Sequence, residues 1–250
     1  MRVFGIDTST ACGSVGLIDE GSVISEYLLN TSVTHSERLL KAIELVLREA
    51  RYTMEDLDGW AISLGPGSFT GLRIGVSTVK GLAFATGTPV VGASTLDVLA
   101  SQISPTPYLL CPVLDAKKDE VYTAFYQYGE GDLLRRLSAY QAIRPEDLVK
   151  KIKERTIFVG SGVGIYGDYL QSSLPSFAIF PPFPLNAPLG SMAAKLGYDL
   201  LRKGEYLDLS TFVPIYVRPS EAELKWLERH PDCLLPHKKM LPEGSLKRRG

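Results

Sequence analysis

Histidine and cysteine are scarce in this sequence, with three residues of each among 250. The cysteines, Cys12, Cys111 and Cys233, show no CxxC spacing, which counts against a zinc cluster and a disulfide framework and fits a reducing cytoplasm. The sequence has no charged-then-apolar leader and no apolar run of about 18 residues, so we expect no membrane segment. The formal net charge of -1 argues against an overall electrostatic grip on nucleic acid.

Glycine, by contrast, is concentrated in one stretch, GPGSFTGLRIG at 65–75, which follows the apolar run 60–64. The pattern predicts a strand, a tight turn and a helix with Ser68 as its N-cap. Such a turn has two interpretations: its free N–H groups could hold a phosphate, or its small residues could allow close packing.

A repeated layout predicts the architecture, because residues 2–29 and 108–140 both show the pattern strand, turn, strand, turn, strand. Helix and strand patterns follow each copy, which indicates mixed sheets flanked by helices. The strands of the second copy are expected at 108–114, 121–128 and 133–140, and the later elements at 36–51, 59–64, 68–86, 145–154 and 156–160.

The expected fold class is therefore α/β, with two tandem lobes and a cleft between them. We place the first lobe at 1–103 and the second at 104–220, with a helix near 189–202 that packs back on the first lobe. Residues 221–250 form a polar, basic tail that we expect to be flexible. From Pro236 onward we expect it to be functionally silent, although contact with nucleic-acid phosphates is an alternative.

Five ordered motifs carry a family resemblance over residues 1–223. They are DTST at 7–10, THSERLL at 34–40, GPGSFTGLRIG at 65–75, LDAKKDEVYTAFY at 114–126 and PIYVRPSEAE at 214–223. Within the group of actin-like, sugar-kinase and Hsp70 folds, the chain resembles the TsaB (YeaZ) family of the bacterial tRNA threonylcarbamoyladenosine machinery. The resemblance implies two actin-like (RNase H-like) lobes and a cytoplasmic, non-catalytic partner of TsaD, which modifies adenosine 37 of tRNAs reading ANN codons. It also implies that a TsaE-like ATPase joins the pair and that tRNA is met through the complex.

A metal site is not expected. TsaD-like proteins carry H-x-x-x-H on a helix, whereas His35 has Leu39 at that spacing and the other histidines, His230 and His237, lie in the tail. This pattern counts against threonylcarbamoyl transfer by the chain itself and against a second alternative function, a metal-dependent peptidase. No Ser or Cys triad is indicated either, so we assign no catalytic residue.

The nucleotide question stays open. Asp7, Thr8 and Ser9 stand where relatives place a phosphate-binding turn, and Gly160 and Gly162 could form an adenosine-side turn. The second turn, 115–119, lacks the glycines of a phosphate loop, and there is no Walker A lysine. We expect no required cofactor, but weak or partner-dependent binding of ATP or ADP with Mg²⁺ is an alternative, as is an actin-like ATPase or small-molecule kinase. The structural alternative for residues 7–9 is a turn whose backbone groups are hydrogen-bonded by its own side chains.

The first two helices are the expected partner interface, since TsaB-like proteins pair with TsaD through them. Apolar and small residues follow both helices at helical spacing. The alternative for Gly71 and Gly75 is close packing on the chain's own sheet, and a homodimer of the isolated chain is left open. The candidate interface residues are Ser36, Leu39, Leu40, Ile43 and Leu47 in the first helix and Arg73, Ile74, Ser77, Lys80 and Gly81 in the second.

Overall fold

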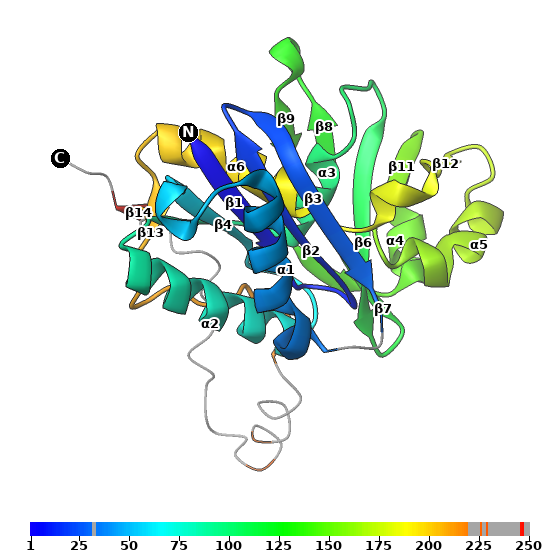
Figure 1. The fold of residues 1–250 in the computed structure, drawn as a ribbon. Helices are drawn as coiled ribbons and strands as arrows, with labels where there is room; N and C mark the ends of the chain where they lie inside the picture. Colours follow the sequence, from blue (N-terminus) through cyan, green and yellow to red (C-terminus); the bar gives the residue numbers. More distant parts are fainter. Residues whose placement is uncertain (32–33, 220–225, 227–228, 230–245, 248–250) are drawn as a thin grey trace.

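The computed structural model describes residues 1–31, 34–219, 226, 229 and 246–247 (Figure 1). Most of the tail predicted at 221–250 therefore lies outside the described residues. The helices and strands form two mixed sheets with helices packed on them, which confirms the α/β class.

The first sheet has the strand order β3-β2-β1-β4-β5. β1 pairs antiparallel with β2, and β2 with β3, whereas β4 and β5 are parallel to β1. This is the predicted arrangement of three antiparallel strands followed by alternating helix and strand. The strands are β1 (Arg2–Asp7), β2 (Cys12–Asp19), β3 (Ser22–Asn30), β4 (Gly59–Ser63) and β5 (Val90–Ala93).

Helices cover both faces of this sheet. On one face, α1 (His35–Ala50) and α2 (Phe69–Thr86) bury a core around Phe4, Ile6 and Trp60. On the opposite face lies α6 (Gly190–Arg202), which packs on Val3 and neighbouring residues. The predicted N-cap of α2 is confirmed, because the Ser68 hydroxyl accepts a hydrogen bond from the Gly71 N–H.

Glycines bring α6 into backbone contact with the sheet. A Cβ atom on Gly5 would lie 1.9 Å from the Gly190 carbonyl oxygen, and one on Gly16 would lie 2.2 Å from the Ser191 nitrogen. The start of α6 has no capping side chain of its own. Instead, the Glu26 carboxylate of β3 accepts hydrogen bonds from the N–H groups of Gly190 and Ser191, at 3.2 and 2.8 Å. A carboxylate at this end of a helix satisfies its free N–H groups and opposes its dipole.

The second sheet has seven strands, and here the predicted strand boundaries are partly wrong. The segment expected at 121–128 is interrupted at Ala124 and Phe125. Of the segment expected at 133–140 only Leu134–Arg136 is a strand, and a further strand, Gln141–Ile143, begins after it. The two halves take different partners: β7 pairs with β10 and β8 with β9. At the break, the Phe125 N–H donates to the Ser138 hydroxyl instead of a strand carbonyl. The strands are β6 (Leu109–Lys117), β7 (Glu120–Thr123), β8 (Tyr126–Tyr128), β9 (Leu134–Arg136), β10 (Gln141–Ile143), β11 (Thr156–Val159) and β12 (Ala178–Ile179).

One helix from the range 1–103 packs on the second sheet. Helix α3 (Thr95–Ser101) packs Leu96 and Leu99 into the core of the second sheet. The helices α4 (Pro145–Lys151) and α5 (Val163–Ser173) pack against each other and against the second sheet. Short 3₁₀ turns are η1 (Met54–Asp56), η2 (Glu130–Asp132) and η3 (Phe183–Asn186).

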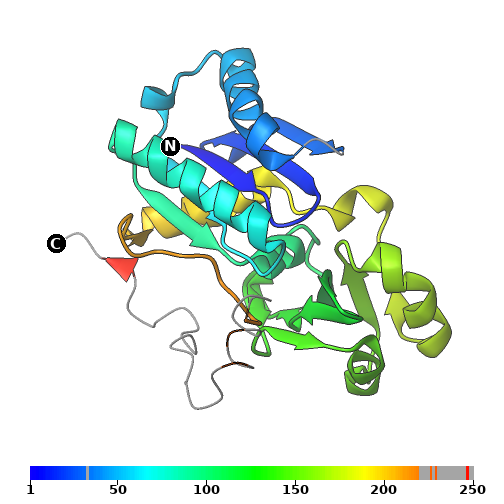
Figure 2. The same ribbon diagram turned by 90° about the horizontal axis from the view of Figure 1, so that it is seen from below.

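An extended segment joins the two lobes after β13 (Tyr206–Leu207), which pairs with β14 (Leu246–Lys247). Residues 208–219, orange in Figure 2, run from the first sheet to the second. We call residues 213–219 the strap. Among the described residues we found no helix with the length and apolar character needed to cross a membrane.

The glycine contacts give a stability prediction with an internal control. Gly5→Ala should lower the free energy of unfolding by about 1–3 kcal/mol, because the added methyl group overpacks the α6 interface. Gly81→Ala should raise it by about 0.5–1 kcal/mol, because a Cβ there meets nothing within 4 Å and alanine is the better helix former. Urea unfolding monitored by circular dichroism measures both. Equal effects of the two substitutions would contradict the packing described here.

Candidate functional site

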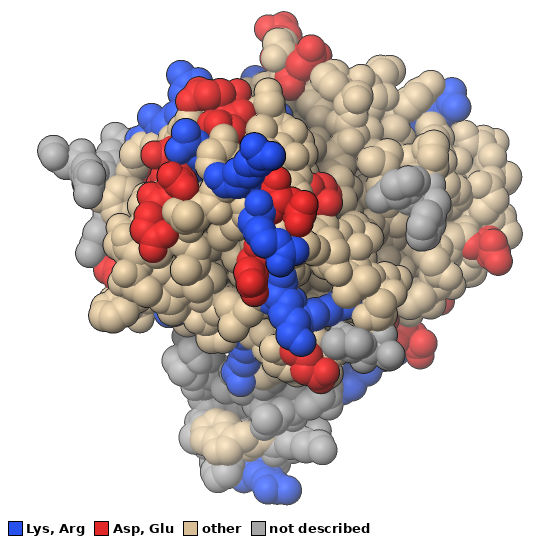
Figure 3. Space-filling model, viewed as in Figure 1, with Lys and Arg blue, Asp and Glu red and all other residues tan. Residues whose placement is uncertain are grey.

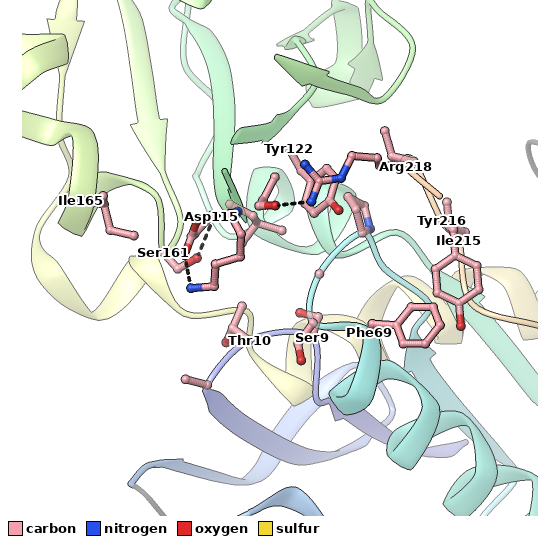
Figure 4. A pocket seen from close by; sticks show the side chains of 18 of the residues that line it. Ser9, Thr10, Phe69, Asp115, Tyr122, Ser161, Ile165, Ile215, Tyr216 and Arg218 are labelled. Atoms are coloured by element: carbon pink, nitrogen blue, oxygen red, sulfur yellow. Dashed lines mark hydrogen bonds and ion pairs between the residues drawn. The ribbon is translucent and has the colours of Figure 1, made fainter. Parts of the chain in front are cut away.

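A cavity of about 600 Å³ lies between the two lobes. Its walls come from the loop after β1, the start of α2, the end of β6, Tyr122 of β7, the start of α5 and the strap. Figure 4 shows Ser9 and Thr10 at its base, Asp115 and Ser161 along one side, and Phe69 beside Tyr216 on another. This is the cleft that the two-lobe prediction anticipated.

Asp7 is fully buried at the end of β1 and does not line the cavity. Its Oδ1 accepts hydrogen bonds from the Ser9 N–H and hydroxyl, at 2.9 and 2.8 Å. Among the described residues, neither its Oδ2 nor the nearby Ser63 hydroxyl has a hydrogen-bond partner of ordinary geometry. Burial raises the pKa of Asp7 to about 6, although the hydroxyls of Ser63 and Ser9 and the Ser9 N–H moderate the rise.

Thr8, the next residue, is held by α2. Its hydroxyl donates to the Gly71 carbonyl oxygen at 2.8 Å. Added Cβ atoms on Gly71 and Gly75 would lie 2.1 Å from the Thr8 carbonyl oxygen and 2.3 Å from its Oγ1. The glycines of GPGSFTGLRIG therefore fit α2 against the chain's own β1 loop, which was the alternative interpretation, and they do not receive another helix.

The THSERLL motif clamps the same loop from α1. His35 Nε2 lies 2.8 Å from the Thr10 carbonyl oxygen, and its Nδ1 lies 3.2 Å from Arg38 Nη2. Arg38, only 9% exposed, also donates to the carbonyl oxygens of Leu29 and Ala11, at 2.9 and 2.7 Å. Burial lowers the pKa of His35, so the neutral ring donates through Nε2 and accepts at Nδ1.

Arg38 is the residue that the sequence interpretation missed. A charged residue on the apolar face of an amphipathic helix could have signalled it. Both ring nitrogens of His35 are engaged in this clamp, which gives the histidine a structural role. Within residues 1–31 and 34–219, no three His, Cys, Asp or Glu side chains come together in a way that could hold a metal ion.

The second turn, predicted at 115–119, begins within the end of β6 and is closed on itself. The Lys117 N–H donates to Asp115 Oδ1 at 2.8 Å, and the Asp115 N–H donates to the Ser161 hydroxyl at 3.4 Å. Lys117 and the two residues after it adopt left-handed backbone angles, with φ between 54° and 60°. Their side chains therefore occupy a tight turn that phosphate loops build from glycine.

Gly160 and Gly162 lie directly against the backbone of Val113 and do not border open space. A Cβ on either would lie 2.4 or 3.0 Å from the Val113 carbonyl oxygen. The Gly162 N–H donates to that oxygen, and the Gly160 N–H donates to Asn186 Oδ1. These glycines thus allow α5 to start close to β6.

The residues present do not fit a magnesium-bound nucleotide. The N–H groups of Ser9 and Lys117, in the two turns where phosphate oxygens would be held, already donate within the chain. The carboxylate that would help to hold Mg²⁺, that of Asp7, is sealed from the cavity. Nucleotide binding would require these groups to leave their present partners.

The strap forms the remaining wall and joins the lobes by side-chain contacts. The Tyr216 ring lies 5.0 Å from the Phe69 ring, and its hydroxyl accepts from Arg73 Nε at 3.1 Å. Arg218 Nη1 donates to Glu120 at 2.7 Å, and Nη2 to the Ala116 carbonyl oxygen at 3.1 Å. The sequence interpretation quoted this motif without assigning its residues a role.

The candidate interface residues separate into two groups. Ser36, Leu40, Arg73, Ser77 and Gly81 are exposed. Leu39, Ile43 and Leu47 are buried in the chain's own core, and Ile74 packs against it, so their side chains support the surface from beneath. Lys80 is half-buried, with its ammonium 4.5 Å from the Phe212 ring centre.

Comparisons with known proteins agree on one family. The family model described as "TsaD: tRNA N6-adenosine threonylcarbamoyltransferase" matches residues 27–226. The chain is 32% identical over 231 residues to "tRNA threonylcarbamoyladenosine biosynthesis protein TsaB" of Bacillus subtilis, covering 91% of this chain and 99% of that protein. The solved structure "YeaZ from Pseudomonas aeruginosa" is 28% identical, with a TM-score of 0.71, and covers 86% of this chain and 99% of that one.

A more distant structural likeness concerns the fold alone. Component A of the (R)-2-hydroxyglutaryl-CoA dehydratase of Acidaminococcus fermentans superposes with a TM-score of 0.51 at 12% identity. The match covers 81% of this chain and 100% of that chain. It supports the actin-like ATPase fold of the two lobes.

Asp7 gives a pH prediction. Its pKa is about 6 in the folded chain against an ordinary value of 3.8, so the folded state binds a proton more tightly than the unfolded state. Stability should therefore fall as pH rises from about 4 to about 6, by up to about 3 kcal/mol from this group. Asp7→Asn, which keeps an oxygen to accept from Ser9, should remove that decline. Parallel pH profiles of unfolding free energy for the two proteins would contradict the prediction.

Proposed function

The chain belongs to the TsaB family, within the TsaD-type domain family, and from this we propose a non-catalytic role in the biosynthesis of tRNA threonylcarbamoyladenosine. In this role it binds a TsaD-like threonylcarbamoyltransferase and enables that subunit to form N6-threonylcarbamoyladenosine at position 37 of tRNAs reading ANN codons. A TsaE-like ATPase joins the pair, and tRNA is met through the complex. Its relatives' names support the pathway, and the exposed face of α2 supports the partner.

The single observation that carries the proposal is an exposed stripe on α2. Arg73, Ser77, Gly81 and Phe84 follow one another at spacings of three or four residues, and Phe84 is 83% exposed. A glycine inside a helix costs about 0.5–1 kcal/mol relative to alanine. At position 71 the chain's own packing requires a glycine, because a Cβ there would clash with Thr8. At position 81 no neighbouring atom within 4 Å requires one. A partner that approaches the helix closely explains both the glycine and the exposed ring.

Helix α1 extends the same surface. Leu40 is 57% exposed beside Ser36, above the buried residues Leu39 and Ile43. Small residues on α2 let a second helix approach to about 8 Å between axes. Figure 3 shows basic and acidic side chains interleaved over the α1 side, so this face carries no large patch of one sign. Such a face favours a protein partner over a nucleic-acid backbone. In the isolated chain it could also serve for self-association.

The non-catalytic assignment has its own support. The TsaD-like H-x-x-x-H pair would need a second imidazole where Leu39 stands, and Leu39 is 5% exposed in the core. His35 uses both ring nitrogens to hold the β1 loop. The cavity also lacks a phosphate cradle, which disfavours the rival function of an actin-like ATPase or small-molecule kinase.

Reconstitution of tRNA modification tests the role directly. TsaD-like, TsaE-like and threonylcarbamoyl-AMP-forming proteins should modify tRNA only when this chain is added. Modified adenosine is measured by mass spectrometry of nucleosides from the tRNA. Full modification with this chain omitted would overturn the proposal.

The docking face gives a matched pair of substitutions. Ser77→Arg places a long charged side chain in the middle of the α2 stripe and should weaken binding to the TsaD-like subunit about tenfold or more. Ser172→Arg, the same change on the exposed side of α5, should leave affinity unchanged. Isothermal titration with the purified partner measures both. Wild-type affinity of the Ser77 variant would exclude this face as the interface.

A further inference from the structure

The cavity between the lobes has aromatic and aliphatic walls. The adjoining rings of Phe69 and Tyr216 stand on one side, Tyr122 contributes a third ring, and Ile165 points in from α5 (Figure 4). Its volume of about 600 Å³ lies within the range of small-molecule sites, about 300–1,000 Å³. The space and its lining therefore suit a ring system of moderate size.

Both basic side chains that line the cavity are neutralised by the chain itself. Lys117 Nζ lies 2.5 Å from Asp115 Oδ2, and Arg218 is bound to Glu120 at 2.7 Å. An anionic ligand would have to compete with these carboxylates, and a cationic one with the bases. The Lys117 side chain is 82% exposed, so its ion pair is weak. Arg218 and Glu120 are only 22% and 28% exposed, and a charged ligand there would have to separate a pair that is largely shielded from water.

The groups left for recognition are hydroxyls. The oxygens of Ser68, Ser161 and Tyr216 each accept one hydrogen bond from the chain, from Gly71, Asp115 and Arg73. A hydroxyl that accepts keeps its own hydrogen to donate. These hydroxyls can thus bind neutral acceptors such as ring nitrogens or carbonyl oxygens, whereas the N–H groups of Ser9, Ser68 and Lys117 already donate within the chain.

We infer that this cavity binds an uncharged, planar aromatic compound, which stacks against the Phe69–Tyr216 pair and receives hydrogen bonds from the surrounding hydroxyls. This inference is independent of the proposed role in tRNA modification. It also differs from the alternative of weak nucleotide binding, because recognition rests on the ring and makes no use of phosphates.

Probes that share a ring but differ in charge test the inference. Adenosine, 9-methyladenine and Mg-ATP are titrated separately into the full chain by ligand-observed NMR and calorimetry. Adenosine or 9-methyladenine should bind, and Mg-ATP should bind no more tightly than adenosine. Tighter binding of Mg-ATP by about tenfold would overturn the inference in favour of a phosphate site. Lack of binding by both neutral probes at millimolar concentration would overturn it as well.

Two cavity variants and one control variant locate the binding. Ile165→Trp fills the cavity from α5 and should weaken the neutral probe about tenfold or more. Tyr169→Trp, one turn further along the same helix and outside the lining, should not. Phe69→Leu keeps apolar volume but removes the stacking ring, and should weaken binding about threefold to tenfold. Unchanged affinity in both cavity variants, with their circular dichroism intact, would place the probe elsewhere and overturn the inference.

Discussion

The loop after β1 is held from two sides, and the arrangement of the first lobe depends on that grip. Arg38 and His35 reach it from α1 and bind its carbonyl oxygens. From α2, Gly71 and Gly75 leave no space between the helix and Thr8. The first sheet, α1 and α2 therefore form one rigid unit, because backbone contacts this close prevent the helices from shifting relative to the sheet. The same loop supplies Ser9 and Thr10 to the cavity, so the cavity wall and the exposed α2 face share one support.

Local signals in the sequence predicted the parts of the fold that depend on neighbouring residues. The Ser68 cap, the glycine turn and the start of α1 follow from residue types within one helical turn. The split of the second-lobe strands did not follow, because it depends on which strand each half meets. The Glu26 contact with Gly190 and Ser191 joins residues far apart in the chain, and no local pattern marks it. Membership of α3 in the second core is likewise a matter of tertiary packing.

The candidate site shows the same division. The motifs around residues 7–10, 34–40 and 65–75 could be found in the sequence, but the contacts that their residues make could not be predicted from it. Only the structure reveals that they contact one another and that Asp7 faces inward from the cavity. Whether a turn's N–H groups are free or already donating is a property of its surroundings. A phosphate-binding turn and a self-satisfied turn can therefore have nearly the same residues.

The position of α6 in the chain has a consequence for synthesis. This helix covers the face of the first sheet formed by Val3, Ile18 and Val91, yet it is translated after every strand of the second sheet. Domains generally fold as units while the chain emerges, starting from the N-terminus. Here the first unit lacks its cover until residue 202 has left the ribosome. A nascent chain that stalls before residue 190 carries an uncovered apolar sheet face, the kind of surface that chaperones bind.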